Sequence, residues 1–309
     1  MSQELAVDLQ KYRGQWGGKI DSGEEMWWSE PNAKLARGSR WSRFWYGMDT
    51  RQHFLLRFAR RALAGAPGSA CVADFGCGTG GTTLNLSSAL GRPITGYDLF
   101  PTQLTIAAAM AQGCSGSVAA RCPFEKLRAD GALPVADGAI DLLLSVDVLG
   151  HVPNIERTLA DLARALRPGG VVALFTESTY SEGDSSLMAR LAREGLDMTA
   201  AVTEHISLVP REQLEKWFVA AGFEIRERFS ANVCHFLFFP KDYVLLLNRG
   251  GRAQHRVLYW TAWVWDRVSK VTPFYPWPFQ ILRTALTHLL GRRAFGTSYF
   301  YELKRRDRC

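Results

Sequence analysis

The chain has 309 residues, 47% of them hydrophobic, which is enough to bury a large core and argues against a disordered protein. Its six cysteines form no C-x-x-C pair and its six histidines no H-E-x-x-H motif, so neither a disulfide framework nor a metal site is expected. The net charge of +7 lies entirely after residue 239, because residues 240–309 hold 13 Lys and Arg against 4 Asp and Glu while the remainder holds 24 against 26.

Residues 1–69 are predicted to form an aromatic N-terminal arm that folds over a ligand as a lid. They show no regular apolar period until residues 54–63, which predict an amphipathic helix that Pro67 and Gly68 close. The chain has no leader-like opening and no run of the roughly 18 apolar residues that cross a membrane, so we expect a cytoplasmic protein. The tryptophans of the arm are Trp16, Trp27, Trp28, Trp41 and Trp45.

Residues 70–239 are predicted to form an α/β domain. Short apolar runs alternate with helical patterns at the spacing of βαβ units, which predicts a doubly wound, mostly parallel, seven-stranded sheet covered on both faces. The predicted strands are 71–75, 93–98, 124–129, 140–146, 170–177 and 223–229, and the predicted helices are 80–90, 101–111, 155–166 and 211–221.

Residues 240–295 are predicted to be a helical insertion that caps the substrate, followed by a final strand and tail over 296–309. Apolar segments at 243–247, 258–268 and 279–290 surround a turn-rich stretch at 273–278. Antiparallel edge strands are common on parallel sheets, so the closing strand need not continue the alternation. The basic residues of the insertion can bind an acceptor's phosphate or carboxylate, rest with its tryptophans on an anionic membrane, or form a solvated face. They are Arg249, Arg252, Arg256, Arg267, Lys270, Arg283, Arg292 and Arg293.

A glycine-rich run joins the first strand to the first helix. Gly76, Gly78 and Gly80 allow a sharp turn and a close approach to a ligand, in a spacing that a dinucleotide-binding loop also shows. Asp74 favours a different ligand, because its carboxylate repels the pyrophosphate of NAD and attracts the ammonium and sulfonium of S-adenosylmethionine. Asp98 ends the second strand, where it can accept ribose hydroxyls or cap the helix ahead of Pro101.

Together with the segments 129–134, 140–145, 166–170 and 220–224, these motifs occur in the order that resembles class I S-adenosylmethionine-dependent methyltransferases over residues 70–229. The resemblance implies that the methionine moiety lies against Asp74 and the loop Gly76, Cys77, Gly78, Thr79 and Gly80. It further implies that Asp98 and Leu99 hold the ribose and adenine, Asp130 the adenine amino group with Gly131 beside it, and Ser145 and Val146 the methyl end. One residue fewer than usual follows Asp130 before the Leu-Pro pair, so a loop-capping role for Asp130 is the alternative.

Methyl transfer from a sulfonium requires positioning of the acceptor and only optionally a base. Ligands of open α/β sheets bind beyond the carboxyl ends of the strands, which places residues 147–154 beside the methyl group. His151 is therefore a candidate base, although Gly150 replaces the glutamate that the family usually has before this histidine. Glu177, Tyr180 and His205 face the same crevice by topology and are further candidates.

The sequence thus favours an S-adenosylmethionine-dependent methyltransferase for a small, partly apolar acceptor, either a metabolite or a lipid, that can carry a phosphate or carboxylate. The alternatives are an NAD-dependent oxidoreductase and a non-catalytic S-adenosylmethionine-binding protein whose basic tail docks on a membrane or a partner. No Asn-Pro-Pro-Tyr-like segment follows residues 140–146, so we do not expect nucleic acid as a substrate. The sequence determines neither the oligomeric state nor the atom that is methylated.

Overall fold

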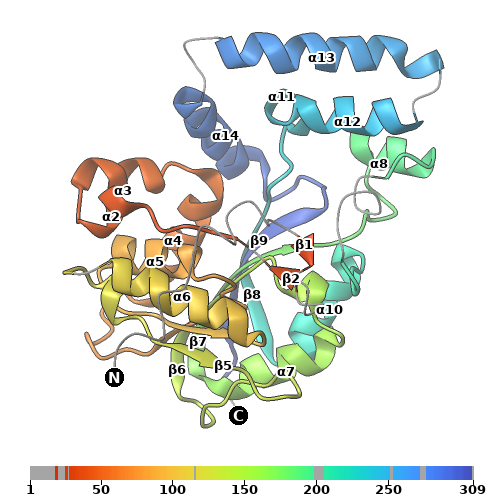
Figure 1. The fold of residues 1–309 in the computed structure, drawn as a ribbon. Coiled ribbons are helices and arrows are strands. Elements are labelled where there is room, and N and C mark those ends of the chain that lie inside the picture. Colours follow the sequence, from red (N-terminus) through yellow and green to blue (C-terminus); the bar gives the residue numbers. More distant parts are fainter. Residues whose placement is uncertain are drawn as a thin grey trace.

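A seven-stranded sheet in the order β5-β4-β3-β6-β7-β9-β8 forms the centre of the computed structural model (Figure 1). The structure describes residues 18–19, 25–26, 28–114, 116–197, 205–250, 253–271 and 276–307, without the side chains of residues 18, 19, 25, 26, 249 and 250. A short antiparallel pair, β1 (Gly18–Lys19) and β2 (Glu25–Met26), lies outside this sheet. The strands of the sheet are β3 (Val72–Phe75), β4 (Thr95–Asp98), β5 (Phe124–Lys126), β6 (Ile140–Val146), β7 (Leu166–Glu177), β8 (Phe223–Ser230) and β9 (Ser298–Arg305).

The predicted doubly wound, mostly parallel sheet is confirmed, with one correction for the closing strand. β9 is antiparallel to both β7 and β8 and lies between them, so it is not an edge strand. Its residues Tyr299 to Leu303 are buried without alternation, which is the pattern of a strand covered on both faces. The chain order reverses between β3 and β6, and their carboxyl ends form the switch point where open α/β sheets bind ligands.

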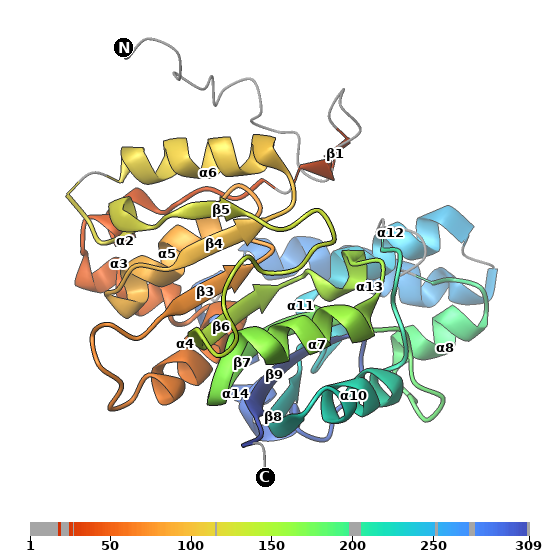
Figure 2. The same ribbon diagram turned by 90° about the horizontal axis from the view of Figure 1, so that it is seen from below.

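Helices cover both faces of the sheet (Figure 2). On one face α4 (Thr50–Ala62), α5 (Gly81–Leu90) and α6 (Pro101–Gly113) bury their apolar sides in one core cluster with the strands. On the other face α7 (Ile155–Ala165) and α10 (Arg211–Ala220) bury theirs in a second cluster. Phe54 of α4 stacks on Phe300 of β9 with ring centroids 4.9 Å apart, so this part of the N-terminal arm belongs to the packed core.

Further helices lie beyond the carboxyl end of the sheet (Figure 1). α8 (Leu187–Arg193), α12 (Pro240–Gly250) and α13 (Arg256–Val271) share a third apolar cluster, which explains how the insertion folds without lying on the sheet. The remaining helices are α2 (Ala33–Ala36), α3 (Arg40–Tyr46), α11 (His235–Phe238), α14 (Trp277–Leu290) and the 3-10 turns η1 (Ala119–Arg121), η2 (Leu149–His151) and η3 (Ala253–His255). Among the described residues, none of the helices has the length and apolar character needed to cross a bilayer.

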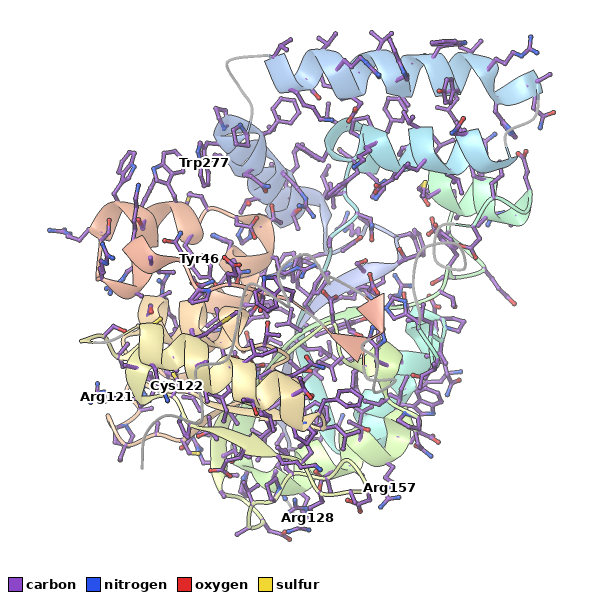
Figure 3. The ribbon with its side chains drawn as sticks, viewed as in Figure 1. Tyr46, Arg121, Cys122, Arg128, Arg157 and Trp277 are labelled. Atoms are coloured by element: carbon purple, nitrogen blue, oxygen red, sulfur yellow. The ribbon has the colours of Figure 1, made fainter. Side chains whose placement is uncertain are left out.

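Sequence patterns missed some of these helices. α2 and α3 begin at Asn32 and Ser39, whose side chains accept backbone N–H groups of the first turn, and these capping residues were the available signal. The stretch read as a turn at 273–278 is partly wrong, because α14 already begins at Trp277 and tolerates Pro278 in its first turn, while 272–275 lie outside the described residues. Trp277 points toward α3 and lies 4.8 Å from Trp45, centroid to centroid (Figure 3).

Candidate active site

The glycine-rich turn after β3 has a backbone that excludes larger residues. Gly76 has a φ of +76°, and a Cβ there would overlap the Val148 side chain. A Cβ on Gly81 would overlap the backbone of Ser29, so the N-terminal arm lies directly on the loop. Ser29 N donates to Thr79 Oγ1 at 2.8 Å and Thr79 Oγ1 donates to Ser29 O at 3.1 Å, which fixes the arm there.

A first cavity of about 730 Å³ opens at the carboxyl ends of β3, β4 and β6. Thr79, Gly80 and Ser145 are not part of its wall: Thr79 bonds to Ser29, Gly80 precedes α5, and Ser145 is fully buried in β6. The other residues predicted to contact the cofactor do line it, with His151 from the following turn. They are Asp74, Gly76, Cys77, Gly78, Asp98, Leu99, Asp130, Gly131 and Val146.

Asp74 is buried in the wall of this cavity, and only one of its two carboxylate oxygens accepts a hydrogen bond from the described residues. Its Oδ2 accepts a hydrogen bond from Thr83 Oγ1 at 2.6 Å, whereas its buried Oδ1 has no hydrogen-bond partner among the described residues. Burial raises the pKa of Asp74 to about 6, and the nearby Asp98 adds to the rise. A cationic ligand group would satisfy Oδ1 and favour the ionised form, so the site fits the ammonium of S-adenosylmethionine.

Asp98 ties the end of β4 to the glycine loop. Its Oδ2 accepts from Gly78 N at 2.8 Å and its Oδ1 accepts from Phe100 N at 3.1 Å. The alternative that Asp98 is the helix N-cap is wrong, because α6 has Phe100 at that position and Pro101 in its first turn.

Asp130 stands at the exposed rim of the same cavity. It accepts from Ala132 N at 3.2 Å and forms an ion pair with Arg157 at 2.6 Å, while Gly131 takes a φ of +82°. This is the geometry of a capped turn. Asp130 therefore caps its own loop, as the alternative predicted, and also lines the cavity.

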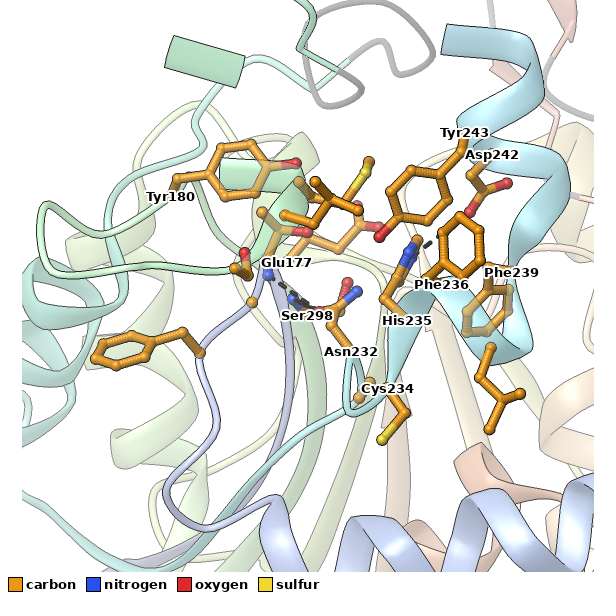
Figure 4. A pocket seen from close by; sticks show the side chains of 18 of the residues that line it. Glu177, Tyr180, Asn232, Cys234, His235, Phe236, Phe239, Asp242, Tyr243 and Ser298 are labelled. Atoms are coloured by element: carbon orange, nitrogen blue, oxygen red, sulfur yellow. Dashed lines mark hydrogen bonds and ion pairs between the residues drawn. The ribbon is translucent and has the colours of Figure 1, made fainter. Parts of the chain in front are cut away.

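A second cavity, also about 730 Å³, lies beyond the ends of β7 and β9 and is partly enclosed by residues of the insertion. Glu177, Tyr180 and His205 line this cavity, whereas His151 lines the first. Tyr180 and Tyr243 stand on opposite sides with their hydroxyl groups directed inward (Figure 4). Burial raises the pKa of both tyrosines well above its usual range, so both hydroxyls stay protonated at neutral pH.

Arg51 of α4 lines both cavities and marks where they meet. It forms a 2.9 Å ion pair with Asp147 and lies over the Phe175 ring at 4.4 Å. Asp147 has a φ of +59°, which is strained for a residue with a Cβ, and burial raises its pKa to about 6 against the opposing effect of Arg51. Sequence reasoning did not find Arg51, because no local pattern links α4 to the turn after β6.

Glu177 and His205 form an ion pair at this same junction, through Oε2 and Nε2. The Nδ1 atom of His205 is buried and has no hydrogen-bond partner among the described residues, and the His205 ring lies 4.5 Å from that of His151. A Cβ at Gly150 would overlap the His205 ring. The departure from the family's Glu-His pattern therefore makes room for a histidine from a distant segment.

The chain is similar to a family of known proteins. A family described as a methyltransferase domain matches residues 48–228, which is more than half of the chain. The ubiquinone biosynthesis O-methyltransferase of Rhizobium leguminosarum bv. trifolii is 29% identical over 159 residues, covering 51% of this chain and 60% of that protein. The demethylmenaquinone methyltransferase of Tropheryma whipplei is 36% identical over 103 residues, covering 32% of this chain and 38% of that protein. The chain therefore spans less than two thirds of the length of these curated relatives.

Among solved structures, the chain is similar to a putative sarcosine dimethylglycine methyltransferase from Galdieria sulphuraria. The TM-score is 0.48 at 18% identity, over 81% of this chain and 84% of that chain.

Proposed function

The chain belongs to the class I S-adenosylmethionine-dependent methyltransferases, and on this premise we propose that it methylates a hydroxyl oxygen of a small, apolar, ring-bearing acceptor. It is an enzyme with S-adenosylmethionine as its cofactor, so the oxidoreductase and the non-catalytic binding protein are no longer alternatives. Similarity to small-molecule methyltransferases supports a small molecule as its substrate. The methylated atom, the acceptor class and the residue roles below belong to the proposal.

We infer oxygen as the methylated atom from the Glu177–His205 pair. Because Nε2 of His205 lies against the Glu177 carboxylate, the proton of the neutral ring resides on Nε2 and leaves Nδ1 as the acceptor. Nδ1 is buried and has no partner among the described residues, so it is available to take a proton from an acceptor hydroxyl in the second cavity. A hydroxyl needs such a base more than an amine does, since it loses its proton during methylation.

The first cavity is the proposed cofactor site and the second the proposed acceptor site. The bound cofactor supplies a methyl group already activated by its sulfonium. Asp74 and Asp98 hold its polar groups, while the Arg51–Asp147 pair fixes the wall where the two cavities meet. His151 packs against His205 and keeps that ring in place. Tyr180 donates a hydrogen bond to the acceptor from the far wall.

The flanking segments shape the acceptor site. Residues 240–295 act as the substrate cap, which is supported by Asp242, Tyr243, Arg283 and Phe295 in the wall of the second cavity. The N-terminal arm acts as a lid on the cofactor, supported by Trp28 and Ser29 in the wall of the first. The aromatic and aliphatic lining suits a ring-bearing acceptor. Similarity to a ubiquinone biosynthesis O-methyltransferase and a demethylmenaquinone methyltransferase supports methylation of a small molecule.

The experiment compares His205→Asn with a matched control. His255 also pairs with a glutamate, Glu194 at 2.9 Å, but lines neither cavity. The protein is incubated with radiolabelled S-adenosylmethionine and an extract, and labelled products are separated into ethers, amines and carbon-methylated species. We expect ether products, a loss of about 10²- to 10³-fold in kcat for His205→Asn, and near wild-type turnover for His255→Asn. Labelled amines, or a His205→Asn enzyme as fast as the control, would contradict the proposal.

Peripheral contact with an anionic membrane belongs to the same proposal. α13 is the outermost helix (Figure 1) and exposes Val257, Trp260 and Val264 by 79, 55 and 50%. Arg256 and Arg267 flank this apolar stripe, as in helices that lie in a lipid surface. Co-sedimentation with phosphatidylglycerol vesicles, weakened by salt and by Trp260→Asp, is the expected result; equal binding to phosphatidylcholine would contradict it.

A further inference from the structure

The wall of the second cavity, the proposed acceptor site, contains the guanidinium of Arg283, which pairs with no carboxylate of the described residues. We propose that Arg283 anchors an oxyanion, a carboxylate or phosphate, on the acceptor molecule. The inference rests on the proposed function, since it names the substrate class of that same cavity. Arg283 lies on α14 in the insertion and does not line the first cavity.

Each of the other charged side chains in the cavity wall is paired with a carboxylate, a guanidinium or an imidazole. The pairs are Arg51 with Asp147 at 2.9 Å, Glu177 with His205, and Asp242 with His235 at 3.6 Å. Burial lowers the pKa of His235 to about 4, so this histidine is neutral at physiological pH and adds no cation. Among the described lining residues, Arg283 is therefore the cation that remains for a ligand.

Arg283 itself is fixed but unsatisfied. Its Nη2 donates to Ala231 O at 3.3 Å and its guanidinium lies 4.4 Å above the Phe239 ring, while its buried Nε has no hydrogen-bond partner among the described residues. No described carboxylate lies within 4.0 Å of it, although Asp49 acts on it from farther away. A desolvated cation of this kind is unfavourable until an anion meets it, because its hydration is lost without replacement.

The remaining geometry favours an oxyanion that can accept two hydrogen bonds. A guanidinium stacked on an aromatic face keeps its N–H edge free for the two oxygens of a carboxylate or phosphate. Asn232, next to Ala231 in the chain, also lines the cavity (Figure 4). Its Oδ1 accepts from Thr297 N at 3.0 Å and Ser298 N at 2.8 Å, so its amide N–H₂ can donate to a ligand. Arg283 and Asn232 are therefore the two donors that we assign to this oxyanion.

The test measures binding of matched probes by calorimetry in the presence of S-adenosylhomocysteine. The probes are 4-hydroxycinnamate, its neutral methyl ester, and phenyl phosphate, so that the carboxylate and phosphate sources of an oxyanion are separate arms. We expect one of the anions to bind wild type about tenfold more tightly than the ester. Arg283→Gln should abolish that preference without changing the affinity for the ester, and Arg283→Lys should retain part of it.

Arg267→Gln is the matched control, since it removes the same charge from the insertion at a residue that stacks on Trp263 and does not line the cavity. Equal binding of ester and anions to wild type, equal weakening of both by Arg283→Gln, or no binding of either anion at millimolar concentration would each overturn the proposal. Binding of S-adenosylhomocysteine to every variant shows that the chain is folded. If that binding persists and hydroxyl methylation is observed while the anion preference is absent, only the oxyanion site fails and the proposed function stands.

Discussion

Replacing Asp74 by asparagine should stabilise the cofactor-free protein and at the same time weaken its binding of S-adenosylmethionine. The carboxylate is buried, and its Oδ1 has no hydrogen-bond partner among the described residues. Asparagine has nearly the same shape and can still accept the 2.6 Å hydrogen bond from Thr83, so the substitution removes the charge and little else.

The size of the effect follows from the pKa. Burial raises the pKa of Asp74 from 3.8 to about 6. The folded chain therefore holds the proton more tightly than the unfolded chain, and stability falls as the pH rises between these two values. Above pH 6 the charged side chain costs about 3 kcal/mol, since each pKa unit corresponds to about 1.36 kcal/mol. Below the unfolded pKa both states are protonated and the cost vanishes.

The assay is urea unfolding of wild type and Asp74→Asn from pH 4 to pH 8, without cofactor. We expect the variant to be more stable by about 3 kcal/mol at pH 8 and equal to wild type near pH 4. Asp137→Asn, at an exposed surface ion pair, should change the free energy of unfolding by less than about 1 kcal/mol. Calorimetry should show binding of S-adenosylmethionine weakened about ten- to a hundredfold by Asp74→Asn, as for a lost hydrogen bond to a charged group. A variant less stable than wild type at pH 8, or one that binds the cofactor normally, would refute this account.

Two further substitutions probe the junction of the cavities. Gly150→Ala should displace the His205 ring and lower kcat at least about tenfold while cofactor affinity is kept, and unchanged turnover would show that the ring is not held there by packing. Arg51→Met should leave Asp147 without its cation and lower stability at pH 8 by about 1 kcal/mol, a modest figure because both partners are partly exposed. Burial keeps the pKa of Asp147 near 6, so this loss should shrink at pH 5, where the side chain is protonated; a loss independent of pH in urea unfolding would contradict the ion-pair account.

Local pattern was sufficient for most of the sheet and its helices. The run from Ile140 to Val146 is continuously apolar apart from Asp141 and Ser145, and it forms the central strand that the pattern predicts. β9 shows where local pattern fails: its residues predict a strand, but whether that strand lies at the edge or inside depends on pairing with β7 and β8. The helices α2 and α3 were missed because they are short and their capping residues are the main signal.

The same division applies to the site. Asp74, Gly76 and Asp98 could be named as candidate cofactor contacts because each lies near the carboxyl end of a predicted strand or in the turn directly after it, which is a local pattern. Arg51 could not, since it reaches the cavities from a helix far along the chain, and nothing in the sequence distinguished Arg283 from the other basic residues of the insertion. His205 was a candidate in the sequence, but its pairing with Glu177 and its place beside Gly150 emerged only in three dimensions.

From sequence alone come the class of fold, the family and the charge of the cofactor, because these depend on periodicity and on a contiguous loop whose backbone and carboxylate act locally. The tertiary structure alone decides which side chains meet at the second cavity and which of its cations lacks a partner. Those properties depend on pairwise distances between segments from α4, β7, α11 and α14, and distances of that kind are set by tertiary packing between elements far apart in the sequence. Periodicity carries no information about them.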